Sequence, residues 1–164
     1  MRNGFILLVE DDADDVYFVS EALRRSGIHL PLEVAHDGQK AVDLLLKAGH
    51  SVVPAEATHP CLVLLDLNLP RKTGLEVLKW IRQESPWKTL IVIVLTSSTS
   101  DSDMEQAYLL GANSYILKPS DATKLRELGQ LLKQYWLGWN QDPPRTKKVV
   151  TTSEPQRRWS SREA

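Results

Sequence analysis

Charged residues directly follow three short apolar runs of the sequence: Glu10 and Asp11 follow the first, Asp66 the second and Lys118 the third. Apolar runs without polar alternation are typical of buried strands in a parallel sheet, whose carboxyl ends form one ligand-binding edge. Carboxylates that lie close together need a cation, and Mg²⁺ prefers oxygen ligands such as carboxylates and phosphates. With a lysine to neutralise the transferring oxygens, the set predicts a site where the Asp66 carboxylate attacks a phosphoryl group.

The rest of the sequence supplies the elements that must hold this site. Five apolar runs alternate with five segments of helical periodicity. The runs are residues 5–9, 32–35, 62–65, 90–95 and 114–117, and the helical segments are 14–26, 39–48, 75–84, 101–110 and 122–136. This alternation predicts an α/β fold, the flavodoxin-like (βα)5 doubly wound parallel sheet with strand order 2-1-3-4-5. Residues 49–60 are longer than a usual connection in such a fold and are predicted to be an insertion.

The composition favours one intracellular domain. The 164 residues carry 20 basic and 21 acidic side chains, a balance that provides no overall field for nucleic acid or an anionic membrane. No stretch approaches the roughly 20 apolar residues of a membrane span, and the single Cys61 cannot form an intrachain disulfide, so we expect a soluble cytoplasmic protein. Residues 1–139 are predicted to be the domain. Residues 140–164 are predicted to be a disordered tail, too short for a DNA-binding output domain.

Residues 1–137 resemble the receiver domains of bacterial two-component response regulators. That family has an acidic pair after the first strand, a phosphoaccepting Asp after the third, a Thr or Ser after the fourth, an aromatic residue in the fifth and Lys-Pro after it. The matching positions in this chain are Glu10, Asp11, Asp66, Thr96, Tyr115, Lys118 and Pro119. The resemblance implies a signalling protein that accepts a phosphoryl group on Asp66 from a sensor histidine kinase, with Mg²⁺ as its cofactor.

The resemblance also implies a role for each residue at the phosphorylation site. Glu10, Asp11, Asp66 and the backbone carbonyl of Asn68 would hold Mg²⁺. Lys118 would pair with a phosphoryl oxygen and help to neutralise its charge.

Three further residues would transmit the phosphorylated state. Thr96 would hydrogen-bond a phosphoryl oxygen and draw its loop inward, and Tyr115 would rotate into the vacated space. The peptide bond before Pro119 would be cis. The polar side chains of Asn68 and Ser98 would flank the path of the attacking water and tune hydrolysis of the phosphoryl group.

Other functions fit the residues less well or stay open. An aspartate-nucleophile phosphatase that resembles the haloacid dehalogenase group needs a second carboxylate two residues after the nucleophile, where this chain has Asn68. We therefore expect a phosphoacceptor and not an enzyme, acting only in its own phosphorylation and dephosphorylation. A phosphorelay intermediate that passes its phosphoryl group to a phosphotransfer protein stays open, as does a phosphate-independent interaction scaffold.

Finer similarity favours one subgroup. The segments 65–70 and 95–98 and the aromatic pair Tyr135-Trp136 are similar to those of single-domain regulators that serve bacterial phytochrome histidine kinases. Those relatives dimerise through their last two helices and last strand, which implies a homodimer through residues 101–139. The last helical segment agrees, because it carries more apolar residues than one core-facing stripe requires.

The acidic residues after Asp11 have a structural explanation. Asp12 is predicted to cap the first helix, and Asp14 and Asp15 would favour the positive N-terminal end of that helix. For these three residues we prefer this structural role to a place among the metal ligands.

Overall fold

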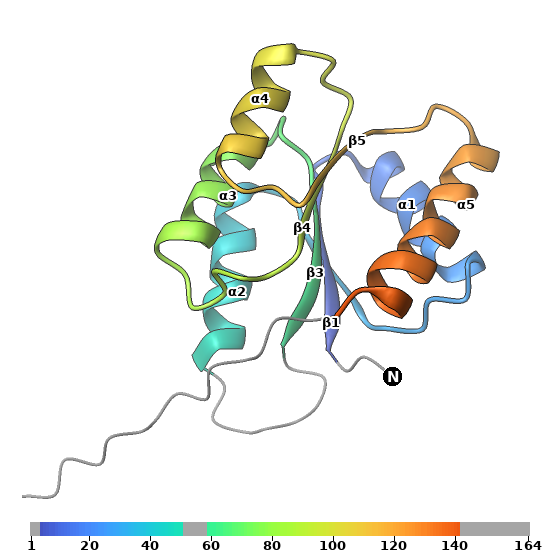
Figure 1. Ribbon diagram of the computed structural model, residues 1–164, viewed down its shortest axis with the longest axis horizontal. Coiled ribbons are helices and arrows are strands. Elements are labelled where there is room, and N and C mark those ends of the chain that lie inside the picture. Colours follow the sequence, from blue (N-terminus) through green and yellow to red (C-terminus); the bar gives the residue numbers. More distant parts are fainter. Residues whose placement is uncertain (1–3, 51–58, 142–164) are drawn as a thin grey trace, which may run out of the picture.

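Five parallel strands form the centre of the molecule (Figure 1). The computed structural model describes residues 4–50 and 59–141. The strands are β1 (Phe5–Val9), β2 (Leu32–Ala35), β3 (Pro60–Leu65), β4 (Val92–Thr96) and β5 (Ser114–Leu117). They follow the order β2-β1-β3-β4-β5, so the predicted flavodoxin-like fold is confirmed.

Helices cover both faces of the sheet (Figure 1). They are α1 (Ala13–Arg25), α2 (Gly38–His50), α3 (Gly74–Gln83), α4 (Asp101–Leu109), α5 (Ala122–Leu131) and the π-helix η1 (Leu132–Trp139). One face is covered by α1 and α5, and the other by α2, α3 and α4. The predicted helix 122–136 thus divides into α5 and η1, where backbone hydrogen bonds span five residues. The Asn140 N–H, for example, donates to the Tyr135 carbonyl at 2.8 Å.

Apolar side chains fill both interfaces between the sheet and the helices, which explains why the central strands lack polar alternation. Along β1, Leu7 and Val9 pack against the layer of α2 and α3, whereas Ile6 and Leu8 pack against the layer of α1. These four side chains are at most 1% exposed. Burial of one such side chain contributes about 1.5–3 kcal/mol to stability. The strand that carries Glu10 at its end is therefore fixed from both faces.

Some predictions lie outside the described residues, and one is wrong. Residues 51–58 of the predicted insertion and 142–164 of the predicted tail are not among those described. The described residues contain no cis peptide bond, so the bond before Pro119 is trans, the isomer that X–Pro bonds favour by about 0.5–1 kcal/mol. Within residues 4–50 and 59–141, no helix is long and apolar enough to cross a membrane.

Candidate functional site

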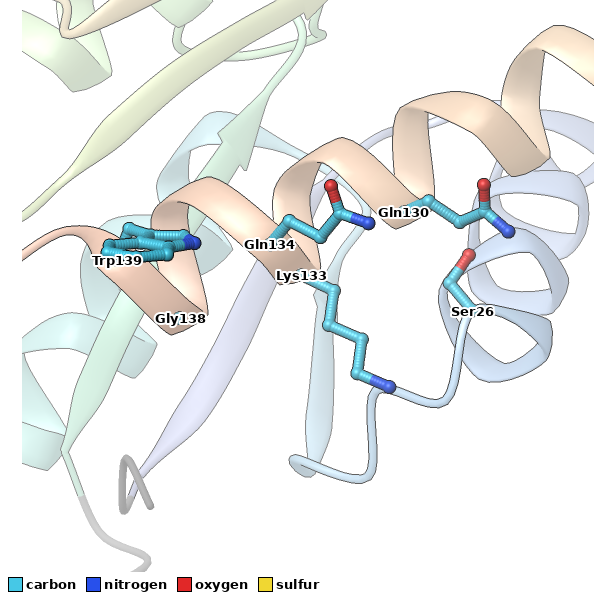
Figure 2. A pocket seen from close by; sticks show the side chains of 6 residues that line it. All are labelled: Ser26, Gln130, Lys133, Gln134, Gly138 and Trp139. Carbon is cyan, nitrogen blue, oxygen red and sulfur yellow. The ribbon is translucent and has the colours of Figure 1, made fainter.

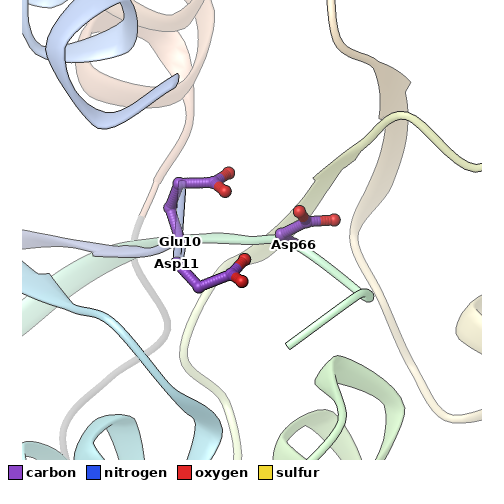
Figure 3. A group of neighbouring side chains, drawn as sticks. All are labelled: Glu10, Asp11 and Asp66. Atoms are coloured by element: carbon purple, nitrogen blue, oxygen red, sulfur yellow. The ribbon is translucent and has the colours of Figure 1, made fainter. Parts of the chain in front are cut away.

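The carboxyl ends of β1 and β3 bring three carboxylates together (Figure 3). The parallel register pairs Val9 with Leu65, so Glu10 and Asp66 leave neighbouring strands at the same level. One oxygen from each of Glu10, Asp11 and Asp66 lies within 4.8 Å of the other two. Glu10 and Asp66 are buried, whereas Asp11 is exposed. Such a group of oxygen donors suits a hard divalent cation that keeps some of its water ligands.

Lys118 supplies the positive charge of the site from the end of β5. Its Nζ lies 2.5 Å from Glu10 Oε2, 2.7 Å from Asp15 Oδ2 and 2.9 Å from Asp66 Oδ2. Burial opposes the charged form of Lys118, but hydrogen bonds to Asp15, Glu10 and Asp66 outweigh it and raise the pKa of Lys118. Burial also raises the pKa of Glu10, by more than Lys118 lowers it. One cation faces three carboxylates, and this surplus of negative charge favours binding of a further cation.

Hydrogen bonds fix the orientation of the Asp66 carboxylate. Its Oδ1 accepts from the backbone N–H groups of Leu67 at 2.6 Å and Asn68 at 3.3 Å, and from the Thr96 hydroxyl at 2.6 Å. Its Oδ2 accepts from Lys118 at 2.9 Å. Thr96 is fully buried at the end of β4. The carboxylate is thus held by groups from three strand ends, in the way that a positioned nucleophile requires.

A second chain of hydrogen bonds runs through the segment between β4 and α4. The Tyr115 hydroxyl donates to the Ser98 carbonyl at 3.0 Å, and the Ser98 hydroxyl donates to Asp103 Oδ2 at 2.6 Å. The Ser98 N–H in turn donates to the Thr96 hydroxyl oxygen at 3.3 Å. Tyr115 is half-buried. Thr96, which contacts Asp66, is therefore linked directly to Ser98, which reaches the helix α4.

Gly74 helps to position Asp66, a role that was not predicted from the sequence. It begins α3 against the loop that follows β3. A Cβ at this position would collide with the backbone carbonyl of Asp66 and with Cα of Leu67. Only glycine permits this approach, which helps to fix the backbone of Asp66. The side chain of Asn68 is exposed beside this loop, and Pro119 is half-buried after Lys118.

The acidic residues of α1 divide into two groups. Asp12 caps the helix, as predicted, because its Oδ1 accepts from the N–H groups of Asp14 and Asp15 at 2.9 Å each. Asp15 also contacts Lys118, a role that was not predicted. Asp15 lies in the first turn of the helix that begins directly after the acidic pair and its capping residue, and how this helix packs brings it to Lys118.

A pocket on another part of the surface has no connection with these carboxylates. It lies between the C-terminal end of α1 and the helices α5 and η1, and Figure 2 shows Lys133 reaching toward the end of α1. Its lining consists of polar side chains, a glycine and one tryptophan: Ser26, Gln130, Lys133, Gln134, Gly138 and Trp139. Because none of the predicted site residues lines it, this pocket is not part of the candidate site.

Comparison with known proteins links this geometry to one family. Residues 6–130 match the model of the response regulator receiver domain. The chain is 39% identical over 141 residues to the probable methanogenesis regulatory protein FilR2 of Methanothrix harundinacea, covering 84% of this chain and 86% of that protein. It is 38% identical over 132 residues to the response regulator Rcp1 of Synechocystis, covering 80% and 88%.

Solved structures give the same result. The phosphorylated cyanobacterial phytochrome response regulator RcpA is similar with a TM-score of 0.76 and 32% identity, covering 88% of this chain and 100% of that one. The Mn²⁺-bound form of Rcp1 is similar with a TM-score of 0.73 and 35% identity, covering 87% and 99%.

Proposed function

Because the chain belongs to the family of response regulator receiver domains, we propose that it is a signalling switch controlled by phosphorylation of Asp66. The observation that carries the proposal is the setting of this carboxylate. It is 4% exposed and lies between the ammonium of Lys118 and the hydroxyl of Thr96. A buried carboxylate held beside a cation and a hydroxyl suits a nucleophile for phosphoryl transfer.

Mg²⁺ is the metal that we propose for the site. Glu10, Asp11 and Asp66 would hold it with carboxylate oxygens, and Asn68 with its backbone carbonyl. The donor set fits, because every donor atom is an oxygen. In addition, three carboxylates surround the ammonium of Lys118, so the site keeps a net negative charge. A relative, Rcp1, has a Mn²⁺-bound form. When bound, the ion neutralises charge on the transferring oxygens.

In the proposed reaction an oxygen of Asp66 attacks the phosphorus of a phosphohistidine on a sensor kinase. The new O–P bond forms as the N–P bond breaks, and the imidazole leaves with the electron pair. Lys118 pairs with an oxygen of the arriving phosphoryl group. In dephosphorylation, water attacks the phosphorus, inorganic phosphate leaves and the free Asp66 carboxylate returns. The protein acts on no other substrate in this scheme, so it is a phosphoacceptor and not an enzyme in the usual sense.

The signal would pass through Thr96 and Tyr115. At present the Thr96 hydroxyl donates to Asp66 Oδ1, and Tyr115 donates to the Ser98 carbonyl. Phosphorylation would remove the charge of the Asp66 carboxylate and place negative charge on the phosphoryl oxygens. The Thr96 hydroxyl would then donate to a phosphoryl oxygen and move the attached segment, because a hydrogen bond to a charged acceptor is the stronger one. Tyr115 would change its contacts with the same segment, and Pro119 would limit the movement of the chain after Lys118.

A sensor histidine kinase is the partner that this function requires, and we propose a phytochrome kinase. Support comes from the relative RcpA, a cyanobacterial phytochrome response regulator. A phosphorelay role, with transfer onward to a phosphotransfer protein, is the alternative. Incubation of the phosphorylated protein with a histidine phosphotransfer domain separates the two, because only a relay intermediate loses its phosphoryl group to that domain rapidly.

We also propose that two copies of the chain associate through residues 101–139. Large apolar side chains are exposed on α4, β5, α5 and η1: Tyr108, Leu109, Leu117, Leu131, Tyr135 and Trp139. Sedimentation velocity over a range of concentrations should show a dimer. Leu131→Gln with Trp139→Gln should abolish it, and Tyr17→Gln on exposed α1 is the control. A monomer at every concentration contradicts the proposal.

We propose further that Asn68 and Ser98 set the lifetime of the phosphoryl group. The backbone N–H of Asn68 donates to Asp66 Oδ1 and that of Ser98 donates to the Thr96 hydroxyl oxygen, so both residues lie next to the proposed phosphorylation site. Replacing both with bulky residues should change the rate of dephosphorylation several-fold, whereas Ser97→Arg on the neighbouring exposed position should not. An unchanged rate in the double variant argues against this role.

The decisive experiment is intact mass spectrometry after incubation with acetyl phosphate and Mg²⁺. We expect the mass of one phosphoryl group, lost in Asp66→Asn and in the presence of a chelator. Asp43→Asn, which changes an exposed carboxylate on α2, is the matched control and should be phosphorylated normally. Absence of phosphorylation, also with a panel of histidine kinases, would favour the phosphate-independent scaffold.

A further inference from the structure

Lys118 has a third carboxylate partner, Asp15, which lies on a helix and does not follow a strand as Glu10 and Asp66 do. Its ammonium carries three N–H donors. Three carboxylates accept from it: Glu10 after β1, Asp66 after β3, and Asp15 in the first turn of α1. The side chain of Lys118 is 11% exposed, so these three carboxylates satisfy a cation that has little access to water.

Asp15 differs from the other two partners in what else it can do. Glu10 and Asp66 belong to the group of three residues that can hold a metal ion, and Asp15 does not. Asp66 is also the proposed phosphoacceptor. Once Glu10 and Asp66 bind a metal ion and a phosphoryl group, Asp15 is the one carboxylate of the three without a competing role.

We infer that Asp15 is a positioning residue that keeps the Lys118 ammonium at the site while the other two carboxylates exchange partners. The inference rests on the proposed function. Asp15 is suited to this task because α1 fixes its backbone, through the cap by Asp12, while its side chain stays 42% exposed. A carboxylate that remains in contact with water keeps its charge at little cost, and it still restricts a lysine that has four rotatable carbons.

Two accounts of Asp15 predict opposite effects of its removal. If Asp15 only adds negative charge, Asp15→Asn should speed up reaction with an anionic phosphodonor, because it reduces repulsion. If Asp15 positions Lys118, the same substitution should slow the reaction, because the ammonium spends less time where the phosphoryl oxygens arrive. The sign of the change therefore distinguishes positioning from a general charge effect.

The test measures the rate of phosphorylation by acetyl phosphate at saturating Mg²⁺, by intact mass. We expect phosphorylation of Asp15→Asn to be about twofold to fivefold slower than that of the wild type, because an ion pair with a partly exposed partner contributes less than a fully buried one. Asp14→Asn is the matched control, since it removes the same charge from the same helical turn with no contact to Lys118, and it should match or slightly exceed the wild-type rate. Asp15→Glu, which keeps a carboxylate, should recover part of the rate.

A second measurement addresses Lys118 directly. In the Mg²⁺-loaded protein the ammonium of Lys118 should give a ¹H–¹⁵N signal protected from exchange, and Asp15→Asn should lose it while Asp14→Asn keeps it. Equal rates and equal signals in the two Asn variants would overturn this inference alone, as would a faster reaction of Asp15→Asn. A wild-type protein that accepts no phosphoryl group would overturn the proposed function and this inference together.

Discussion

Two half-buried cations, Lys118 and Arg82, lie at opposite ends of the β4–β5 region and have opposite surroundings. Lys118 follows β5 and contacts three carboxylates. Arg82, near the end of α3, donates only to neutral oxygens among residues 4–50 and 59–141. They are the backbone carbonyls of Gly111, Lys88 and Leu90, at 2.8 to 3.1 Å, and Asn113 Oδ1 at 2.9 Å.

The difference also appears in the pKa values. Burial lowers the pKa of Arg82, since no carboxylate in the described part of the chain offsets the loss of water. The pKa of Lys118 is raised, because hydrogen bonds to carboxylates outweigh its burial. A cation with neutral acceptors from several segments fixes those segments to one another. A cation among surplus carboxylates can exchange one partner for another, which is what a phosphorylation site requires.

Arg82→Met should have the largest effect on stability, because it keeps the length of the side chain but leaves up to four oxygen acceptors without their donors. We expect the free energy of unfolding to fall by about 2–4 kcal/mol. Urea denaturation followed by circular dichroism measures it. Lys79→Met, which removes an exposed cation from the same helix, should change it by less than about 0.5 kcal/mol. A small loss in Arg82→Met would mean that the two cations do not differ in this way.

Asn113→Ala and Asn113→Asp test the same region from the acceptor side. Asn113 Oδ1 accepts from Arg82 and from the N–H of Val92, a buried strand residue. Alanine leaves both donors unpaired and should cost about 1–2 kcal/mol in the same urea experiment. Aspartate keeps the acceptor and gives Arg82 a carboxylate partner, as Lys118 has. The aspartate variant should therefore be at least as stable as the wild type, and an equal loss in both variants would contradict this explanation.

The Lys118 end of this comparison was largely predictable from sequence, and the Arg82 end was not. The alternation of apolar runs and helical segments predicted the sheet, and residues at the ends of parallel strands must share one edge, which placed Asp66 and Lys118 together. The contact of Asp15 with Lys118 depends on how α1 packs across the sheet, which helical periodicity alone does not fix. The partners of Arg82 are mostly backbone carbonyls, which leave no pattern in a sequence.

Lys118→Met should tighten Mg²⁺ binding by about tenfold, because it removes a positive charge that competes with the metal for Glu10 and Asp66. Isothermal titration calorimetry measures the Kd at low ionic strength. Arg82→Met, at the other end of the sheet, should leave the Kd unchanged as long as the protein is folded. If Lys118→Met weakens Mg²⁺ binding, the lysine supports the metal site and does not compete with it.

The smallest effect that we predict concerns pH. Burial raises the pKa of Glu10, so a proton competes with the metal for this carboxylate at a higher pH than is usual for glutamate. Mg²⁺ affinity should therefore fall as the pH falls through this raised pKa, by about threefold between pH 7 and pH 5.

The stability of the metal-free protein should change with pH in the opposite direction. The folded state disfavours charged Glu10, so this group's contribution is present at low pH and is lost as the pH rises through the raised pKa. Glu10→Gln should flatten both curves. Arg82→Met should lower the stability at every pH but leave the shape of both curves unchanged, because the hydrogen-bond acceptors described for Arg82 are neutral oxygens. If Glu10→Gln keeps the full pH dependence of the Mg²⁺ affinity, the proton that competes with the metal binds to another carboxylate of the site and not to Glu10.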